Sequence, residues 1–340
     1  VFAFLVFTFL SYTEEIMARN SRFRPDYFDN SDRVNTLAGG IRMIPVDAPG
    51  GPYRVWTKRV GNNTSIKVLL LHGGPGSTHE YLQACDSFLP AAGVEYYYYD
   101  QLGSAYSDQP KDLSYIKLPH FVEEVEQVRQ ALGLGPDNFY LYGHSWGGWL
   151  SVEYALKYQQ HLKGLILSNS MASSPAYNAY ATNVLMPEID PEALAEIKAL
   201  ESAGDYANPR FMELLINHHY INHVLRMPPE EWPEPVMRAI KNLNQDVYVS
   251  MQGPSELGLS GQLLDWDRTA ELHTIKTPTL VIAARYDTMD PAHLEWMAKE
   301  LPNGRYHFCS NGSHLCMYDD QEIYFQGLMD FLYAVDNEKG

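Results

Sequence analysis

A serine with glycines on both sides is the residue of this chain whose setting most clearly favours chemistry. Residues 143–147 read GHSWG, so Ser145 has a glycine two positions before it and another two positions after it. A serine on a sharp strand-to-helix turn needs such neighbours, because the strand and helix backbones pass close together there. A strand-like run, 138–143, precedes the motif and a helical run, 148–159, follows it. This context predicts that Ser145 is a nucleophile held on a strand-to-helix elbow.

A serine hydroxyl is a weak nucleophile, so it needs a histidine base and an acid that orients the base. Asp287 ends the apolar, strand-like run 280–287, and His314 lies in the loop 310–318 just after a further strand-like run. The carboxyl ends of parallel strands share one edge of a sheet, which is where ligands bind. We therefore predict a catalytic triad of Ser145, Asp287 and His314.

Other acids and histidines in the chain compete for these two roles. Asp100 ends an earlier strand-like run, and Asp290 lies three residues beyond Asp287. Asp287 is preferred because it stands at the strand end itself. His293 and His307 fall inside a predicted helix and a predicted strand, so we interpret them as surface or core histidines.

An enzyme of this kind also needs N–H donors for the oxyanion that forms on the attacked carbonyl. The amide of Trp146, directly after the nucleophile, is predicted to be one donor. The run 72–76, HGGPG, follows the apolar, strand-like run 66–71. A glycine-rich loop after an early strand is the expected place of the second donor, and Gly74 is preferred for it, with Gly73 next.

The elements that must position these residues alternate between strands and helices. Strand-like runs lie at 41–46, 53–60, 66–71, 94–100, 138–143, 162–170, 277–287 and 305–310, and helical runs at 121–132, 148–159, 291–301 and 322–335. This alternation predicts the α/β class, with a doubly wound and mainly parallel sheet. Residues 172–262 carry helical patches with no strand pattern between them, so we predict a helical cap inserted between two strands. The core then comprises 36–171 and 263–340, after an N-terminal arm or signal-like segment at 1–35.

The net charge of the chain limits the classes of partner that it can bind. The 340 residues include 42 acidic and 25 basic side chains, for a formal net charge of −17. That charge opposes binding to nucleic acid or to an anionic membrane, both of which need a positive patch. The first ten residues are apolar but fewer than the roughly 20 that span a bilayer. We expect no nucleic-acid partner, no stable membrane association and a cytoplasmic protein, with a truncated signal segment as the alternative for the N-terminus.

The residue patterns do not indicate a metal or cofactor. The three cysteines, Cys85, Cys309 and Cys316, form no CxxC pair, which favours reduced thiols over a zinc site or a disulfide framework. A bond between Cys309 and Cys316, which flank the turn 310–314, is the alternative. Serine, histidine, aspartate and N–H groups are sufficient for the predicted chemistry, so we expect no cofactor.

Five short motifs occur in this chain together with the predicted cap. They are HGGPG, YYDQLGSAYSD, LYGHSWGG, ARYD and GSHL. In this combination the chain resembles the proline iminopeptidase family of the α/β-hydrolase fold over about residues 40–335. The resemblance implies hydrolysis of the amide bond after an unblocked N-terminal residue, preferably proline, in a small peptide. Leu102 and Ala105 depart from the arginine and second glycine that the family usually has after its DQ pair.

The resemblance also implies an anchor for the substrate amine. The segment around Glu256 is similar to the family's segment for a carboxylate that binds the free amine. A carboxylate there would hold the scissile carbonyl at the nucleophile and reject blocked substrates. In some relatives a second acid directly follows the triad aspartate, and here that position is Thr288. Glu213 and Glu230 in the cap are alternative partners for the amine.

Several alternatives stay open at this point. The threonine at position 288 keeps an amino-acid amide hydrolase as an alternative, and the same fold also carries carboxylesterases and lactonases. A non-catalytic binding protein on a hydrolase scaffold is a more remote alternative. The aromatic side chains of Trp146, Tyr106 and Trp232 are candidates for the walls of a pocket that takes an apolar ring.

Overall fold

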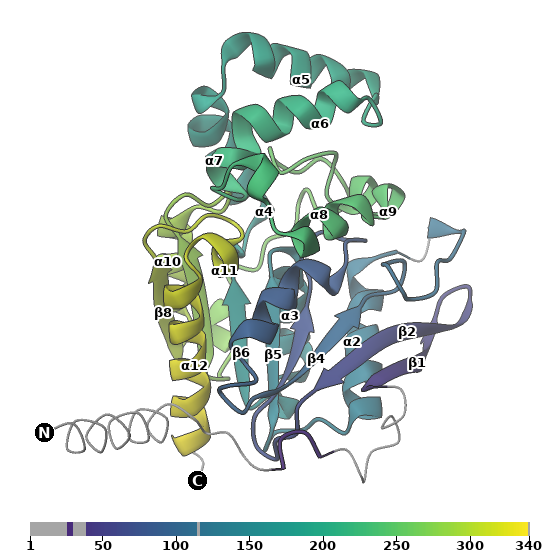
Figure 1. Ribbon diagram of the computed structural model, residues 1–340, viewed down its shortest axis with the longest axis vertical. Coiled ribbons are helices and arrows are strands. Elements are labelled where there is room, and N and C mark those ends of the chain that lie inside the picture. Colours follow the sequence, from purple (N-terminus) through teal and green to yellow (C-terminus); the bar gives the residue numbers. More distant parts are fainter. Residues whose placement is uncertain (1–25, 30–38, 114–115, 339–340) are drawn as a thin grey trace, which may run out of the picture.

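The computed structural model describes residues 26–29, 39–113 and 116–338, and Figure 1 shows how they are arranged. The N-terminal segment predicted at 1–35 lies outside the described residues, apart from 26–29. Within the described part of the chain, no helix is both long enough and apolar enough to cross a membrane.

One eight-stranded sheet forms the centre of the molecule, with the strand order β1-β2-β4-β3-β5-β6-β7-β8. Its strands are β1 (Ile41–Ala48), β2 (Gly51–Val60), β3 (Lys67–Leu71), β4 (Glu95–Asp100), β5 (Phe139–His144), β6 (Gly164–Ser168), β7 (Thr279–Ala284) and β8 (Gly304–Cys309). β1 and β2 form an antiparallel hairpin, and β2 also pairs antiparallel with β4. All the remaining pairs are parallel. The predicted α/β class with a mainly parallel sheet is therefore confirmed.

Side chains of the sheet pack against helices on both of its faces. Helices α2 (Leu118–Leu132), α3 (Trp146–Tyr158) and α10 (Pro291–Glu300) share one hydrophobic cluster, and α12 (Gln321–Glu338) shares the other with the 3-10 segment His79–Ser87. In β4, Tyr97 and Tyr99 belong to the first cluster. Tyr96 and Tyr98 belong to the second. Strands buried on both faces in this way read as continuous apolar runs, which explains the sequence pattern.

Between β6 and β7 the described chain forms a group of helices. These are α4 (Ser174–Tyr180), α5 (Pro191–Ala203), α6 (Pro209–Leu215), α7 (Ile221–His223), α8 (Glu234–Lys241) and α9 (Gln245–Met251). In Figure 1, α5 and α6 lie farthest from the sheet, and α8 and α9 lie nearer to the strand ends. The boundaries 172–262 stay a prediction, and "the cap" refers to these residues below.

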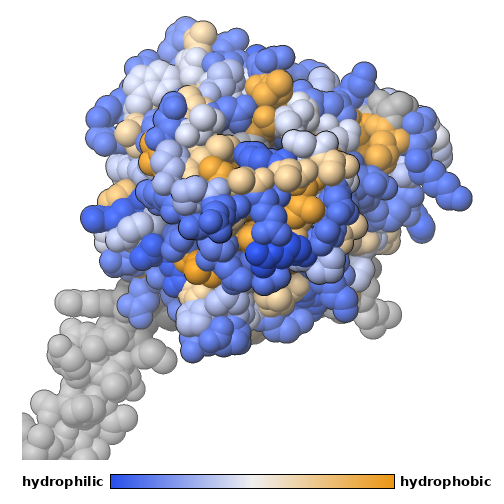
Figure 2. All heavy atoms as spheres, turned by 90° about the horizontal axis from the view of Figure 1, so that it is seen from above, coloured by the Kyte–Doolittle hydropathy of each residue, from blue (hydrophilic) through white to orange (hydrophobic). Residues whose placement is uncertain are grey.

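Apolar side chains of the cap help to join it to the core. Ile197, Phe211 and Leu215 are buried and belong to the same hydrophobic cluster as Leu70 of the sheet. Figure 2 looks at the molecule from above and shows a mostly hydrophilic face, with apolar residues in small groups. Burial of apolar surface is the main favourable contribution to folding, so this shared cluster stabilises the cap on the sheet.

The carboxyl ends of four parallel strands meet at one edge of the sheet. β3 leads into the loop 72–76, and β5 leads directly into Ser145. β7 leads into the loop that carries Asp287, and β8 into the loop that carries His314. Because parallel strands present their carboxyl ends on one side, residues far apart in the chain come together here.

Candidate active site

Ser145 lies between β5 and α3 in a backbone conformation that serine rarely adopts. Its φ is 54° and its ψ is −123°. The Ser145 amide donates to the Ser168 carbonyl at 3.0 Å, and the Gly148 amide donates to the Ser145 carbonyl at 2.8 Å. Strained dihedrals of this kind persist only where the surroundings hold them, and they recur at active sites. The strain here places a serine at the surface of a pocket.

Two glycines of the motif are required by the close approach of backbones. A Cβ atom at Gly143 would overlap the carbonyl group of Gly147. A Cβ atom at Gly147 would overlap the carbonyl group of Leu71, in β3. β5, α3 and β3 therefore meet with no room for a methyl group, which is the geometry that the GHSWG motif predicts.

The side chains of Asp287 and His314 are joined by a hydrogen bond. His314 Nδ1 lies 2.7 Å from Asp287 Oδ1. The other carboxylate oxygen, Oδ2, accepts from Asn169 Nδ2 at 2.7 Å, and Oδ1 also accepts from the Met289 amide at 3.1 Å. Asp287 is fully buried and His314 is 5% exposed. The carboxylate is thus held by several donors and aims one oxygen at the imidazole, as a base-orienting acid must.

The electrostatics of His314 favour its protonated form. Burial alone would lower the pKa of His314, but the attraction of Asp287 and the hydrogen bond to it outweigh burial. The pKa of His314 is therefore raised above its ordinary value. A base with this property stabilises the imidazolium that forms when it takes a proton from a nucleophile.

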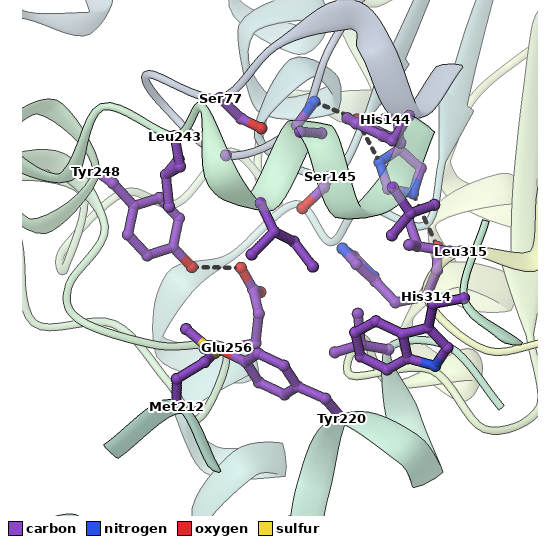
Figure 3. A pocket seen from close by; sticks show the side chains of 18 of the residues that line it. Ser77, His144, Ser145, Met212, Tyr220, Leu243, Tyr248, Glu256, His314 and Leu315 are labelled. Atoms are coloured by element: carbon purple, nitrogen blue, oxygen red, sulfur yellow. Dashed lines mark hydrogen bonds between the residues drawn. The ribbon is translucent and has the colours of Figure 1, made fainter. Parts of the chain in front are cut away.

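Ser145 and His314 line a pocket of about 870 Å³, part of which is open to solvent. Figure 3 shows their side chains close to one another, with Glu256 on a different side of the same cavity. Cap residues form most of the apolar walls, namely Met212, Tyr220, Val224, Trp232, Val236, Ala239, Ile240 and Leu243. Asp287 does not line the pocket and bonds the Nδ1 side of His314. The predicted triad is thus brought together at the floor of a cavity that the cap covers.

Of the three aromatic residues considered as pocket walls, Trp232 lines the cavity. Trp146 does not, because its indole N–H donates to Gln101 Oε1 at 2.8 Å and its ring packs edge-to-face on Phe121. Tyr106 is 56% exposed and its ring lies outside the pocket. The interpretation of Trp146 and Tyr106 as wall residues was wrong, because the direction of each side chain follows from partners that are distant in the sequence.

The competing acids and histidines have other partners. Asp100 is buried and its Oδ1 lies 2.8 Å from His79 Nδ1, away from the pocket. Asp290 is the N-cap of α10, where its side chain accepts from the Ala292 amide. His293 and His307 lie in α10 and β8, as the sequence pattern predicts, and neither lines the pocket.

The glycine loop 72–76 contributes two residues to the pocket, Gly73 and Gly74. A Cβ atom at Gly73 would lie only 2.8 Å from the Cβ of Ser145, so this glycine is directly beside the nucleophile. The Gly73 amide, however, already donates to the Tyr81 hydroxyl at 2.5 Å. Among the described residues, the amides of Gly74 and Trp146 have no such acceptor. These two amides are therefore available to an oxyanion. This agrees with the sequence-based preference for Gly74 over Gly73.

Glu256 presents one carboxylate oxygen that is not used by the protein. Its Oε1 accepts from the Tyr248 hydroxyl at 2.5 Å and from Gln252 Nε2 at 2.8 Å. Its Oε2 is buried and has no hydrogen-bond partner among the described residues. Glu256 is also the one carboxylate among the described residues that line the pocket, and no lysine or arginine lines it. An unpaired buried acceptor is costly, so this oxygen points to a donor from a ligand.

The other positions considered for binding the substrate amine, residues 213, 230 and 288, offer no carboxylate to the pocket. Thr288 is fully buried behind the triad, with its hydroxyl 3.2 Å from His314 Nδ1, and it does not line the pocket. Glu213 forms an ion pair with Arg210 at 3.0 Å on the surface of the cap, and Glu230 is exposed. Glu256 is therefore the sole one of these acids that the structure brings to the nucleophile's cavity.

Sequence reasoning missed the residues that hold these groups in place. Tyr248 and Gln252 are four residues apart, at the end of α9, and both reach the same oxygen of Glu256. Their i, i+4 spacing on a helix was a usable signal. Tyr81 and His144 contact each other and the glycine loop, but their 63-residue separation carries no sequence signal.

Comparison with known proteins agrees with this geometry. The family model described as the alpha/beta hydrolase fold matches residues 67–321. This range includes the glycine loop, the elbow, Asp287 and His314. The mainly parallel sheet, with a strand-to-helix elbow at its carboxyl edge, therefore belongs to an α/β hydrolase.

The similarity extends to a narrower group. The proline iminopeptidase of Flavobacterium johnsoniae is 52% identical to this chain, over 87% of this chain and 99% of its own length. That of Elizabethkingia meningoseptica is 53% identical over the same shares. Among solved structures, VinJ has a TM-score of 0.79 at 30% identity, covering 86% of this chain and 99% of its own. The proline iminopeptidase of Mycobacterium smegmatis has a TM-score of 0.76 at 26% identity, covering 88% and 100%. The chain belongs to the proline iminopeptidase family.

Proposed function

We propose that this protein is a serine aminopeptidase that hydrolyses the amide bond after an unblocked N-terminal residue, preferably proline. The observation that carries the proposal is the free Oε2 of Glu256 in the cavity that also holds Ser145 and His314. Proline iminopeptidases at 52–53% identity over nearly their full length support the same activity. The substrate class is a small peptide with a free amine.

The chemistry follows from the positions of the three triad residues. His314 Nε2 takes the proton of the Ser145 hydroxyl as its oxygen attacks the scissile carbonyl carbon. Asp287 accepts the Nδ1 proton of His314 in a hydrogen bond and stabilises the imidazolium that results. The amide nitrogen of the substrate then takes the proton from His314 and leaves. A water molecule, activated by the same histidine, releases the acyl group from Ser145.

The oxyanion of each tetrahedral intermediate needs N–H donors that are already oriented. The amide of Trp146 and the amide of Gly74 fill this role in our proposal. Gly74 has a φ of +59°, a conformation that glycine adopts without strain. Gly73 would have to exchange its bond to Tyr81 before it could donate to an oxyanion.

Glu256 selects substrates by charge. A protonated substrate amine donates to its free Oε2, while Tyr248 and Gln252 hold the other oxygen in place. A charge-assisted bond of this kind is about twice as strong as a neutral one. An N-acetyl group removes the charge, so a blocked substrate would leave the carboxylate unpaired and be rejected.

An amino-acid amide hydrolase is the second candidate, and one observation favours it. Position 288 holds a buried threonine that does not reach the pocket, so among the described lining residues Glu256 alone offers a carboxylate to the substrate amine. One anchor fixes the substrate less rigidly than two anchors do, and it therefore discriminates less between leaving groups of different size. Prolinamide and alaninamide would then be hydrolysed alongside peptides.

A panel of substrates tests the proposal. Prolyl and alanyl p-nitroanilides, the corresponding amides, their N-acetyl derivatives and short uncharged acyl esters are compared by kcat/KM. We expect the free-amine anilides to be cleaved, with proline preferred, and the acetylated ones to be at least about a hundredfold poorer. Rapid ester turnover without amide cleavage would instead identify an esterase. Failure of a fluorophosphonate to label Ser145 would identify a non-catalytic binding protein.

A further inference from the structure

Tyr81 and His144 lie between the glycine loop and the loop of the catalytic histidine. The Gly73 amide is 2.5 Å from the Tyr81 hydroxyl, which is 2.9 Å from His144 Nδ1. On the other side of the imidazole, His144 Nε2 is 2.8 Å from the backbone carbonyl of His314. Three hydrogen bonds therefore connect two loops that are far apart in the sequence. All four residues are buried.

The donor and the acceptor of each of these three hydrogen bonds can be assigned. A backbone carbonyl only accepts, so the proton on the His144 ring must be on Nε2. Nδ1 of the neutral ring is then an acceptor, and it takes the hydrogen bond of the Tyr81 hydroxyl. The Tyr81 oxygen, in turn, accepts from the Gly73 amide, which can only donate. The order of donation runs from Gly73 through Tyr81 and His144 to His314.

The environment keeps both side chains neutral. Burial, with a smaller contribution from His314, lowers the pKa of His144 well below its ordinary value. Burial likewise raises the pKa of Tyr81, so the phenol keeps its proton. The pKa of His144 is thus shifted downward and that of His314 upward, which favours a neutral His144 ring while His314 carries a charge.

We propose that Tyr81 and His144 are positioning residues that hold the glycine loop 72–76 and the catalytic histidine at a fixed distance and orientation relative to each other. The proposal rests on the proposed function, because it assumes that Ser145 and His314 act as nucleophile and base. The neighbours of the two residues explain why the relative position of the glycine loop and His314 matters for the reaction. Gly73 lies directly beside Ser145, and Gly74 follows it with a proposed oxyanion donor. His144 immediately precedes the nucleophile, so the hydrogen bonds also fix the start of the elbow.

Displacements of about 1 Å between reacting groups reduce rates strongly, even when the displaced residues do not touch the substrate. Tyr81→Phe removes the middle of the hydrogen-bonded chain and leaves the Gly73 amide and His144 Nδ1 without partners. We expect kcat to fall roughly tenfold, less than the hundredfold or more expected for loss of an oxyanion donor itself. KM for a prolyl anilide should change less than about twofold, because Glu256 and the apolar cap residues are untouched and the ring of residue 81 stays in the pocket lining.

The matched control is Tyr142→Phe. Tyr142 is a buried tyrosine of β5 whose hydroxyl bonds the Tyr324 hydroxyl at 2.6 Å, away from the pocket. Like Tyr81→Phe, the variant loses a buried tyrosine hydroxyl and the hydrogen bonding of that hydroxyl, so its melting temperature should also fall. Its kcat should stay at the wild-type level. Equal kcat values for the two variants would overturn the positioning role.

A second pair of variants tests the His144 end of the hydrogen-bonded chain. His144→Gln keeps a side-chain N–H that can donate to the His314 carbonyl, whereas His144→Leu removes both bonds. We expect the glutamine variant to retain several times more kcat than the leucine variant. If Tyr81→Phe does not fold, this pair decides the question, since equal activity of the two would contradict the proposal.

The rate of Ser145 labelling by a fluorophosphonate separates this proposal from the proposed function. The probe needs the nucleophile, the base and the oxyanion donors, but no substrate amine. Wild-type protein that is labelled but does not cleave free-amine substrates would disprove aminopeptidase activity and leave the positioning role testable. Slower labelling of Tyr81→Phe, with normal labelling of Tyr142→Phe, supports positioning. Labelling of Tyr81→Phe at the wild-type rate overturns it.

Discussion

The active-site cavity has two unlike halves, one built by the edge of the sheet and one by the cap. In the sheet half, Ser145, Asp287 and His314 are almost completely buried, and the Asp287 carboxylate has a donor on each oxygen. In the cap half, the walls are mostly apolar, and one oxygen of Glu256 has no partner in the part of the chain that the structure describes. A satisfied network is rigid, whereas an unsatisfied acceptor is stabilised only when a ligand donates to it. In the proposed function, the sheet half carries out the reaction and the cap half selects the substrate.

The two halves are nevertheless joined by hydrogen bonds at the loop of the catalytic histidine. The amide of His314 donates to the His223 carbonyl at 2.9 Å, and the amide of Leu315 donates to the Val224 carbonyl at 2.8 Å. The hydroxyl of Ser313 also donates to the Val224 carbonyl, at 2.9 Å. Hydrogen bonds to the end of α7 thus hold the loop that carries His314 against the cap. The residues proposed for recognition and those proposed for chemistry are therefore connected through the backbone.

The largest effect is expected in the sheet half. Ser145→Ala should reduce kcat by about five orders of magnitude, because it removes the hydroxyl that attacks the carbonyl carbon in the proposed function. Labelling by a fluorophosphonate should disappear, as measured by mass spectrometry. Ser77→Ala removes another hydroxyl that lines the pocket and should still be labelled. Labelling that persists in Ser145→Ala would place the nucleophile elsewhere.

The second effect concerns the orienting acid. Asp287→Asn should reduce kcat by about four orders of magnitude, since the asparagine amide no longer holds the required tautomer of His314. The change should also move the pH profile. Asp287 raises the pKa of His314, so wild-type activity is lost as the pH falls through a value above that of an ordinary histidine. Without the carboxylate, burial lowers this pKa, and the acid limb should shift to lower pH.

An uncharged acyl ester is the right substrate for that pH profile, because it has no amine that titrates in the same range. The control is Asp290→Asn, which changes the N-cap of α10 and should leave the acid limb in place. An unshifted acid limb in Asp287→Asn would show that another group titrates in the wild-type profile.

The third effect belongs to the cap half and should depend on the substrate. Glu256→Gln should raise KM for a prolyl anilide by roughly 10- to 100-fold, the range expected for a lost charge-assisted bond. Activity on an uncharged acyl ester should stay within about twofold of the wild-type value. Glu213→Gln, a surface glutamate of the cap, is the matched control. Equal losses on amine and ester substrates would remove the anchor role and with it the division between the two halves.

The smallest effect tests the connection between the halves. His223 Nδ1 lies 3.0 Å from the carbonyl of Tyr286, next to Asp287, and its Nε2 lies 3.0 Å from Glu188 Oε2. His223→Leu removes both of these side-chain contacts while the backbone bonds remain. We expect kcat to fall about two- to fivefold on amine and ester substrates alike. His218→Leu, on the same cap segment and, like His223, outside the pocket lining, should have no such effect. A loss confined to amine substrates would place His223 in recognition instead.

Much of the sheet half was predictable because its signals are local or follow chain order. The apolar runs predicted the strands, and the GHSWG motif predicted an elbow whose glycines the structure explains by close backbone contacts. Asp287 and His314 were found because they lie close to strand ends, although β7 ends at Ala284, three residues before the predicted strand end at Asp287. The roles of these residues as a triad stay predictions until the variants above are measured.

The cap half was predictable in its helices but not in its contacts. The predicted helical patches include α5, α6 and α8, since periodicity along a helix depends on near neighbours. The same limit applies in the sheet half, where Trp146 was a candidate wall residue and instead bonds Gln101, which is 45 residues away in the chain. Such pairings depend on which elements pack together, and no periodic pattern reports them.

The sequence by itself therefore determined the α/β class, the elbow and the residues that are able to form a triad. Backbone preference, apolar periodicity and the order of residues along the chain act over a few positions and can be read there. Only the tertiary structure decided that Glu256 has an open oxygen in the nucleophile's cavity and that Thr288 does not reach it. It also decided that Tyr81 and His144 connect the two catalytic loops. These relations depend on the packing of distant elements into one buried volume, where each polar group must find its partner.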